Sequence, residues 1–420
     1  MKNLTQCLKV VEEDRALTSP GAKIPYYPLV VKRGRGAVIE DLDGNVYIDM
    51  LSSAGAVNVG HCHPKVVEVI KRQAEELILY THAYMYHEPV VRLTKELVSI
   101  TPGDFRKRVF YGLSGSDAND GAIKLARVST GRPKIVSFIR SYHGSSYGAI
   151  SLSAISLPMT RKIGPLLPEV FHVPYPDPYR PPMPGMSPDQ VSDYCVERIQ
   201  IAFDSYMPAD EVAAFIIEPI QGDAGLVVPP VKFMQDLRAL CDRHGILFIS
   251  EEVQQGFGRT GKWFGIENFG VTPDAVIMGK AIAAGLPLSG VAARAELIET
   301  LEAPVHLFTM GGNPVCCAAA LASIEVIREE NLLPHAAELG EYVRERLRSM
   351  AGRFEFIGDV RGIGLSIGVD LVVDRDTKER HRAAAAKICH RAWEKGLLLS
   401  FVSGSVLRVQ PPLVITQKEM

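Results

Sequence analysis

Short apolar runs recur through the middle of this 420-residue chain, and they restrict its fold more than any other feature. Each is short enough for one buried strand, and segments with helical spacing lie between several of them. The six runs are Arg108–Tyr111, Lys134–Ile139, Ala213–Ile217, Ile246–Ile249, Ala275–Met278 and Leu288–Ala292. This alternation predicts an α/β fold with a buried, mostly parallel sheet.

The composition is typical of a compact protein that binds its ligands at local sites. Hydrophobic residues make up 47% of the chain, so a sizeable core can form. The 46 Lys and Arg residues nearly balance the 48 Asp and Glu residues, which favours neither a nucleic-acid surface nor a membrane anchor. The most apolar window, residues 275–293, carries one charge, Lys280, and is interrupted by glycines and a proline. We interpret it as buried core and not as a membrane span.

The cysteines and the first residues indicate the cellular compartment. The seven cysteines include no CxxC pair, so neither a disulfide framework nor a zinc ribbon fits them. Residues 1–17 mix charged residues with short apolar pieces and lack the apolar stretch of a signal peptide. We therefore expect a cytoplasmic protein.

The two ends of the chain differ in pattern from the middle. Residues 38–50 alternate around Asp43-Gly44 as in a β-hairpin, and after about residue 320 helical patterns mix with strand-like pieces. We expect residues 1–60 and 316–420 to form a smaller α+β domain beside a large domain of residues 61–315. Residues 175–188 hold many prolines and predict a surface excursion.

Three of the apolar runs are followed by ionisable residues, namely Glu218, Glu251 and Lys280. In an open α/β sheet the ligands bind at the carboxyl ends of the strands, where burial can shift a pKa. Among apolar segments Lys280 would favour its neutral form, the nucleophile that a Schiff base needs. The alternative is that these strand ends meet solvent and that Lys280 is a surface charge.

The turn Gly112–Asp117 follows a strand and opens a helix expected over Ala118–Val128. Free N–H groups and the positive end of the helix dipole would attract an anion there. If the carbonyl partner of Lys280 is pyridoxal phosphate (PLP), this turn would hold the phosphate. The alternative is an ordinary helix start capped by Ser116 or Asp117.

Segments along nearly the whole chain resemble, in order, the class III (subgroup II) aminotransferase family of fold type I PLP enzymes. The segments are DLDGNVYIDM, GHCHP, SGSDANDGAIKLAR, SYHG, IIEPIQGDAG, EEVQQGFGRTG, MGKAIAAGLPLS, TMGGNP and VLRVQPPLVIT. Glu251 and Lys280 are 29 residues apart, the usual spacing in that family between the ring-nitrogen carboxylate and the Schiff-base lysine.

The resemblance implies contacts with the cofactor ring. Lys280 would form the aldimine, Tyr142 would stack on the pyridine face, and Gln254 would lie near the ring hydroxyl. Glu251 would keep the ring nitrogen protonated, which makes the ring an electron sink. The family usually has Asp at this position, so the extra methylene of Glu251 must be accommodated.

The resemblance also implies how the phosphate is bound. Gly115 and Ser116 would hold it through backbone and hydroxyl groups. Thr309 would reach the phosphate of the neighbouring subunit, which implies a homodimer or a dimer of dimers. The HCHP sequence at residues 61–64 is a structural turn in this family, and we assign no metal to it.

The residues near the substrate resemble the amino-acid racemase branch of the family, which includes isoleucine 2-epimerases and aminocaprolactam racemases. Aminotransferases of the family commonly have Glu where this chain has Asp223. Asp223 is therefore a candidate second acid/base, and the alternative is that it only supports the cofactor loop. Arg408 takes the family's place for binding a substrate α-carboxylate, which favours a free amino acid over a lactam. From family position, the side-chain pocket would include Tyr26, Ala54 and Tyr84.

The resemblance thus implies a PLP-dependent racemase or 2-epimerase of free neutral amino acids, hydrophobic or branched ones above all. It would remove the α-proton and return it through a quinonoid intermediate. Two alternatives remain open, because about 1.4 kcal/mol changes a branching ratio tenfold. One is a class III aminotransferase of ω-amino acids such as 4-aminobutyrate, and the other is a PLP-binding scaffold without catalysis.

Overall fold

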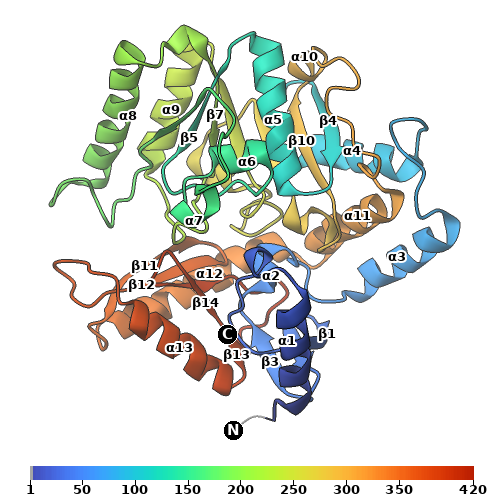
Figure 1. The fold of residues 1–420 in the computed structure, drawn as a ribbon, viewed down its shortest axis with the longest axis vertical. Coiled ribbons are helices and arrows are strands. Elements are labelled where there is room, and N and C mark those ends of the chain that lie inside the picture. The colour runs from blue at the N-terminus through green and yellow to red at the C-terminus, as the bar shows by residue number, and fades with distance from the viewer. Residues whose placement is uncertain (1–2) are drawn as a thin grey trace.

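A seven-stranded sheet lies at the centre of the larger lobe of the structure, a computed structural model that describes residues 3–420 (Figure 1). In sheet order the strands are β4 Lys107–Gly112, β10 Ser289–Arg294, β9 Ala275–Met278, β8 Leu247–Glu251, β7 Val212–Ile217, β5 Lys134–Phe138 and β6 Val170–Val173. β10 is antiparallel to both of its neighbours, and the other four pairs are parallel. The expected α/β fold with a mostly parallel sheet is confirmed.

Both faces of this sheet are buried, as its continuous apolar runs predict. Successive side chains of β7 point to opposite faces, so Ile216 packs in one apolar cluster and Phe215 in the other. Helix α5 Gly115–Thr130 covers the first face with Ala122 and its neighbours, and α9 Val231–His244 covers the second. The sequence did not predict the edge strand β6, whose side chains are only partly buried for most of its length.

The smaller lobe is built from both ends of the chain (Figure 1). One of its sheets contains β1 Val31–Arg35, β2 Val38–Asp41, β3 Val46–Asp49 and β13 Leu397–Leu398, and the other contains β11 Ile357–Ile363, β12 Ser366–Leu371, β15 Val406–Val409 and β14 Ser400–Val402. The antiparallel pairing of β2 with β3 matches the expected hairpin, and β13 joins β3 in parallel. The division into domains at residues 60 and 316 stays a prediction, and residue 316 lies in the first turn of α11.

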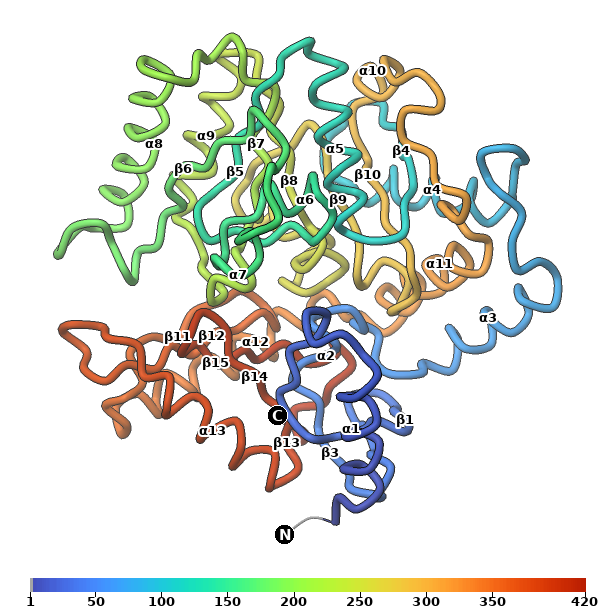
Figure 2. Tube along the Cα trace, viewed as in Figure 1, coloured from blue at the N-terminus to red at the C-terminus, as the bar shows by residue number. Residues whose placement is uncertain are grey.

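The remaining helices cover the two lobes and connect their strands. They are α1 Thr5–Leu17, α2 Ser52–Gly55, α3 Pro64–Glu76, α4 Glu88–Ile100, α6 Tyr147–Leu152, α7 Leu157–Thr160, α8 Pro188–Ser205, α10 Ala295–Ile298, α11 Pro314–Glu329, α12 Leu332–Ala351 and α13 Arg382–Glu394. Figure 2 shows that the two terminal parts of the trace lie in the same lobe. None of the helices within residues 3–420 combines the length and apolarity that crossing a membrane requires.

The parallel register brings the ends of three central strands to one edge of the sheet. Ile217 at the end of β7 is level with Ser250 of β8, and Glu251 is level with Ile277 of β9. The residues that follow these strand ends therefore face the junction with the smaller lobe, which is where open α/β sheets bind ligands.

Candidate active site

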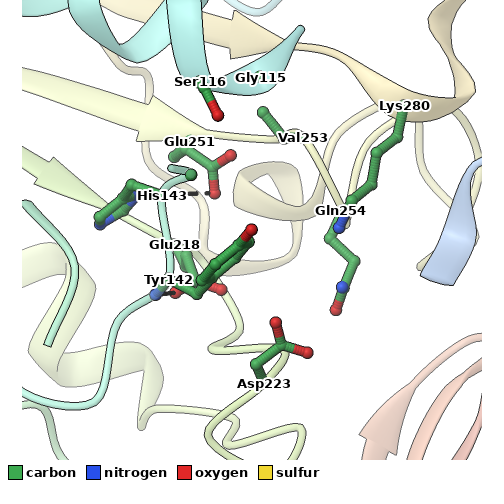
Figure 3. A pocket seen from close by; sticks show the side chains of 11 residues that line it. Gly115, Ser116, Tyr142, His143, Glu218, Asp223, Glu251, Val253, Gln254 and Lys280 are labelled. Atoms are coloured by element: carbon green, nitrogen blue, oxygen red, sulfur yellow. Dashed lines mark hydrogen bonds and ion pairs between the residues drawn. The ribbon is translucent and has the colours of Figure 1, made fainter. Parts of the chain in front are cut away.

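A cavity of about 120 Å³ lies at this edge of the sheet (Figure 3). It brings together the three strand-end residues Glu218, Glu251 and Lys280. Its complete lining is Gly115, Ser116, Tyr142, His143, Gly144, Glu218, Asp223, Glu251, Val253, Gln254 and Lys280.

Lys280 is separated from the end of β9 by Gly279 alone and begins a short 3₁₀ helix, Lys280–Ala283. Its side chain points into the cavity (Figure 3). Burial lowers the pKa of its amine, and the nearby carboxylates of Asp223 and Glu251 only partly oppose this effect. The neutral amine, which is the nucleophilic form, is therefore easier to reach in this site than for a lysine in water.

Glu251 ends β8 and is almost completely buried. Burial raises the pKa of its carboxyl well above the usual range, and the neighbouring Glu218 raises it further. Its Oε2 lies 3.9 Å from Nδ1 of His143. Burial lowers the pKa of His143 to about 3, so this imidazole is neutral, and its Nδ1 has no hydrogen-bond partner among residues 3–420. A buried carboxylate of this kind would be stabilised by a cationic ring nitrogen placed in the cavity.

Another part of the cavity lining comes from the first turn of α5, through Gly115 and Ser116. Ser114, and not Ser116, is the N-cap: its Oγ accepts a hydrogen bond from the N–H of Asp117, whose carboxylate accepts from the N–H of Ser114. The N–H groups of Gly115 and Ser116 lie in the first turn, where a helix offers them no partner. This arrangement suits a phosphate group.

Glycine is required where the backbone of residues 144–145 approaches this turn. Gly144 has a φ of +132°, and a Cβ there would lie 2.1 Å from Oγ of Ser116. The close approach lets the N–H of Ser145 donate to the same Oγ at 3.0 Å. The hydroxyl of Ser116 is thereby held in place beside the free N–H groups.

Glu218 was noted in the sequence as a strand-end residue but was given no role. Its Oε1 accepts a hydrogen bond from the N–H of Tyr142 at 3.0 Å, and its Oε2 accepts one from the N–H of Gly222 at 2.9 Å. Burial nevertheless raises the pKa of Glu218 to about 7. One buried carboxyl thus joins the turn that carries Tyr142 to the turn that carries Asp223. Only its place after an apolar strand could have pointed to it.

Asp223 and Arg408, which are both expected to contact the substrate, contact each other. Nη1 of Arg408 donates to Oδ1 of Asp223 at 2.9 Å, and the Arg408 side chain is only 5% exposed. Arg408 lies on β15, and its Nε also donates to Oγ of Ser400 at 3.3 Å. A carboxylate is therefore already present at the guanidinium where a substrate carboxylate is expected to bind.

The expected cofactor contacts Tyr142 and Gln254 line the cavity. Arg408 is not part of the lining but contacts Asp223, which is, and four other expected residues also lie outside the lining. Tyr26 lines a separate groove of about 800 Å³ made by residues 10–31. Ala54 lies in the short helix α2, the side chain of Tyr84 is 72% exposed, and Thr309 is exposed. Their roles stay predictions.

Comparison with known proteins places these features in a family. The model of the family described as aminotransferase class-III matches residues 21–420. An isoleucine 2-epimerase of Lentilactobacillus buchneri is 48% identical, with 100% of this chain and 93% of that protein covered. A leucine/methionine racemase of Thermococcus litoralis is 45% identical, with 98% and 92% covered. The crystal structure of an amine transaminase from an uncultivated Pseudomonas species, in its PLP-bound form, superposes with a TM-score of 0.88 at 32% identity, covering 96% of this chain and 94% of that one.

Proposed function

The chain belongs to the class III aminotransferase family, and from this premise we propose that it is a PLP-dependent racemase or 2-epimerase of free neutral amino acids. The observation that carries the proposal is that Lys280 and Asp223 enter one cavity from different sides, with the ring of Tyr142 also projecting into it (Figure 3). Inversion at Cα needs a proton donor on the side opposite the base, either a second acid/base side chain or a positioned water, and Asp223 lies where such a side chain is needed.

The residues present fit the cofactor of this family, pyridoxal phosphate. Lys280 would hold its carbonyl carbon, the first turn of α5 its phosphate, Tyr142 its ring face, and Glu251 its ring nitrogen. When bound, the cofactor supplies an electron sink that makes the Cα proton of an attached amino acid acidic. The buried carboxyl of Glu251 and the unpartnered Nδ1 of His143 would offer the ring nitrogen polar partners.

The protein moves the proton. Lys280, as the neutral amine, takes it from Cα on one side, and Asp223, in its protonated form, gives a proton to Cα on the other, so that the configuration inverts. This leaves Lys280 protonated and Asp223 ionised, the protonation states from which conversion of the opposite enantiomer starts. The same two groups exchange roles for the opposite enantiomer. The desolvated amine of Lys280 suits this task because its lowered pKa brings it closer to neutral pH.

Arg408 would bind the α-carboxylate of the substrate. Its contact with Asp223 places that carboxylate next to the second acid/base, which orients Cα toward it. A lactam has no free carboxylate, so this pair supports free amino acids as substrates. The similarity to an isoleucine 2-epimerase and a leucine/methionine racemase supports substrates with neutral side chains, branched or otherwise hydrophobic.

A homodimer, or a dimer of dimers, would complete the site. Thr309 is exposed and lies outside the cavity of its own chain, as a residue that serves a neighbouring subunit must. Large apolar side chains are exposed close to it in sequence and near Tyr84, including Tyr86 at 95% and Met310 at 50%. A second copy of the chain would cover such side chains. The proposed side-chain pocket with Tyr26, Ala54 and Tyr84 would then form between subunits. We place the enzyme in the cytoplasm.

The test is incubation of the holoenzyme with L-isoleucine in deuterated water without any 2-oxo acid. The expected product is D-allo-isoleucine carrying deuterium at Cα, measured by chiral chromatography and mass spectrometry. Turnover that begins only when pyruvate or 2-oxoglutarate is added, with neither exchange nor epimer before, would establish an aminotransferase in its place. If no amino acid shifted the absorbance band of the bound cofactor, the protein would be a binding scaffold.

A further inference from the structure

Asp223 lies on a tight turn of residues 221–227 whose shape comes from its own backbone. Gln221 and Val227 exchange two backbone hydrogen bonds of 3.1 and 3.0 Å, and the N–H of Leu226 donates to the carbonyl of Gly222 at 3.0 Å. Asp223 therefore lies in a closed turn, and the position of its carboxylate depends on what holds that turn against the rest of the protein.

Two arginines donate hydrogen bonds to the carbonyl oxygens of the two residues that follow Asp223. Nη2 of Arg140 donates to the carbonyl of Ala224 at 2.6 Å, and Nε of Arg361 donates to that of Gly225 at 2.8 Å. Gly225 has a φ of +115°, and a Cβ there would lie 3.0 Å from Nη2 of Arg361. The turn is thus shaped to bring its backbone against a guanidinium. Charge-assisted hydrogen bonds of this kind are roughly twice as strong as neutral ones.

The proline-rich excursion, residues 175–188, orients the first of these arginines. Oδ2 of Asp177 accepts a hydrogen bond from Nη1 of Arg140 at 3.1 Å, and Asp177 is 8% exposed. Its other oxygen accepts from the N–H groups of Tyr179 and Arg180, which fixes the carboxylate within the excursion. Figure 1 shows this segment, between β6 and α8, next to the hairpin of β11 and β12.

The same excursion reaches the second arginine through an ion pair with Asp370. Arg180 pairs with this buried carboxylate, and Nη2 of Arg361 contacts it at 3.1 Å. Burial alone would raise the pKa of Asp370, but Arg180 and Arg361 hold it below its usual value, so the carboxylate stays ionised. Asp177 of the excursion therefore orients Arg140, and Asp370, which Arg180 of the excursion binds, orients Arg361.

The backbone of Arg140 also marks it as constrained. It has a φ of +70°, a conformation that a long side chain rarely adopts and that persists only where the surroundings enforce it. Its guanidinium bridges three acceptors, because Nη2 also donates to Oγ of Ser403 at 2.9 Å. The planar fork of Arg140 reaches these acceptors from two separate nitrogens, whereas a lysine would have to reach them from one.

From these contacts we infer that Arg140, oriented by Asp177, is a positioning residue that holds Asp223 where it can protonate Cα from the side opposite Lys280. The inference rests on the proposed function. It assigns to the proline-rich excursion the task of favouring inversion over return of the proton to its original side. Arg140 acts on the reaction only through the position of Asp223.

The test separates inversion from exchange in the holoenzyme of the Arg140→Met variant. L-isoleucine and D-allo-isoleucine are each incubated in deuterated water, and two rates are measured for each: formation of the other epimer and entry of deuterium into the recovered starting epimer. We expect the epimerisation rate to fall about tenfold or more, the change that about 1.4 kcal/mol produces. Exchange in the epimer whose proton Lys280 removes should stay near the wild-type rate, and exchange in the other epimer should fall.

Two further variants and a control sharpen the test. Asp177→Asn removes only the charge that orients Arg140. It should also lower the ratio of epimerisation to exchange, by a smaller factor than Arg140→Met does. If Arg140→Met does not bind the cofactor, Asp177→Asn is the variant that tests the inference. Arg140→Lys should recover part of the ratio. Arg243→Met, on the exposed last turn of α9, is the matched control and should behave as wild type.

The outcomes distinguish this inference from the function on which it rests. If the wild type produces no epimer, the proposed function fails. If the wild type epimerises but the variants keep its ratio of epimerisation to exchange, or lose both rates equally, the positioning role of Arg140 is overturned and the proposed function stands.

Discussion

Replacement of Asp223 by Asn tests the proposed mechanism most directly. The amide keeps the size of the side chain and leaves an oxygen that can accept the hydrogen bond from Arg408. It removes the group that could give or take a proton at neutral pH. The change weakens the contact of 2.9 Å between Asp223 and Arg408, and it also removes the attraction between the Asp223 carboxylate and the Lys280 amine.

The structure lets the effects on catalysis and on stability be separated. A general acid/base contributes a factor of roughly 10² to 10⁴, so epimerisation should fall by about that factor. The change from a charged to a neutral acceptor costs about 1 kcal/mol of unfolding free energy, because the Asp223 side chain is 28% exposed. That cost lowers the melting temperature by no more than roughly 2–4 °C. The loss of activity would therefore not come from unfolding.

The assay follows epimerisation of L-isoleucine and deuterium exchange at Cα in parallel, with a thermal melt of each holoenzyme. Exchange in the epimer that Lys280 deprotonates should persist. KM should stay the same or fall, since the neutral amide competes less with the substrate carboxylate for Arg408. If the variant epimerised as fast as the wild type, Asp223 could not be the second acid/base, and the reasoning from its position would be refuted.

Three other changes have definite expected outcomes. In Lys280→Ala the absorbance band of the bound cofactor and all activity should be lost, and an unchanged band would overturn the assignment of Lys280 as the Schiff-base lysine. The apoprotein of this variant should be more stable than the wild-type apoprotein at pH 7, because burial disfavours the charged form of the lysine. In Gly144→Ala the new Cβ would lie 2.1 Å from Oγ of Ser116, so the variant should bind PLP more weakly, by fluorescence titration, with the wild-type affinity as the contrary result. Glu252, the residue after β8, is completely buried, and its carboxylate accepts hydrogen bonds from the N–H groups of Gly265 and Ile266. Burial raises the pKa of both Glu218 and Glu252 to about 7, so the folded protein binds these protons more tightly than the unfolded chain does. The stability of the apoprotein to urea should then be greatest below pH 4.5 as far as these two groups are concerned, and their contribution should be lost as the pH rises through about 7. If Glu252→Gln left the dependence of the unfolding free energy on pH unchanged in this range, Glu252 would not be one of the groups that cause it.

Much of the large domain could be predicted because its signals are local. A strand that is buried on both faces must be apolar throughout, and β9 coincides with the run Ala275–Met278. A ligand site at the carboxyl ends of such strands follows from the parallel topology, so Lys280 could be expected there before the fold was known. The helix expected over Ala118–Val128 is present, but it begins three residues earlier, at Gly115, because its cap is Ser114 and not Ser116 or Asp117; several neighbouring residues have side chains suited to that role.

The parts that escaped prediction depend on contacts between distant segments. β6 lies at the edge of the sheet, where partial burial leaves a mixed sequence without a clear pattern. Glu218 was visible as a charge at a strand end, but its hydrogen bonds to the backbone of Tyr142 and Gly222 were not. Hydrogen bonds to backbone groups leave no residue preference at the partner position, so the sequence alone does not report them.

By itself the sequence determined the class of fold, the family and the lysine of the site, because each depends on short apolar periods and on motifs whose members are close in the chain. The tertiary structure alone decided how the second side of the site is built. Asp223 and Arg408 are 185 positions apart. The excursion that orients Arg140 contacts the C-terminal part of the chain through the ion pair of Arg180 with Asp370. Such pairings depend on how two lobes close on each other, and a charge in a sequence does not indicate which opposite charge it will meet when the chain folds.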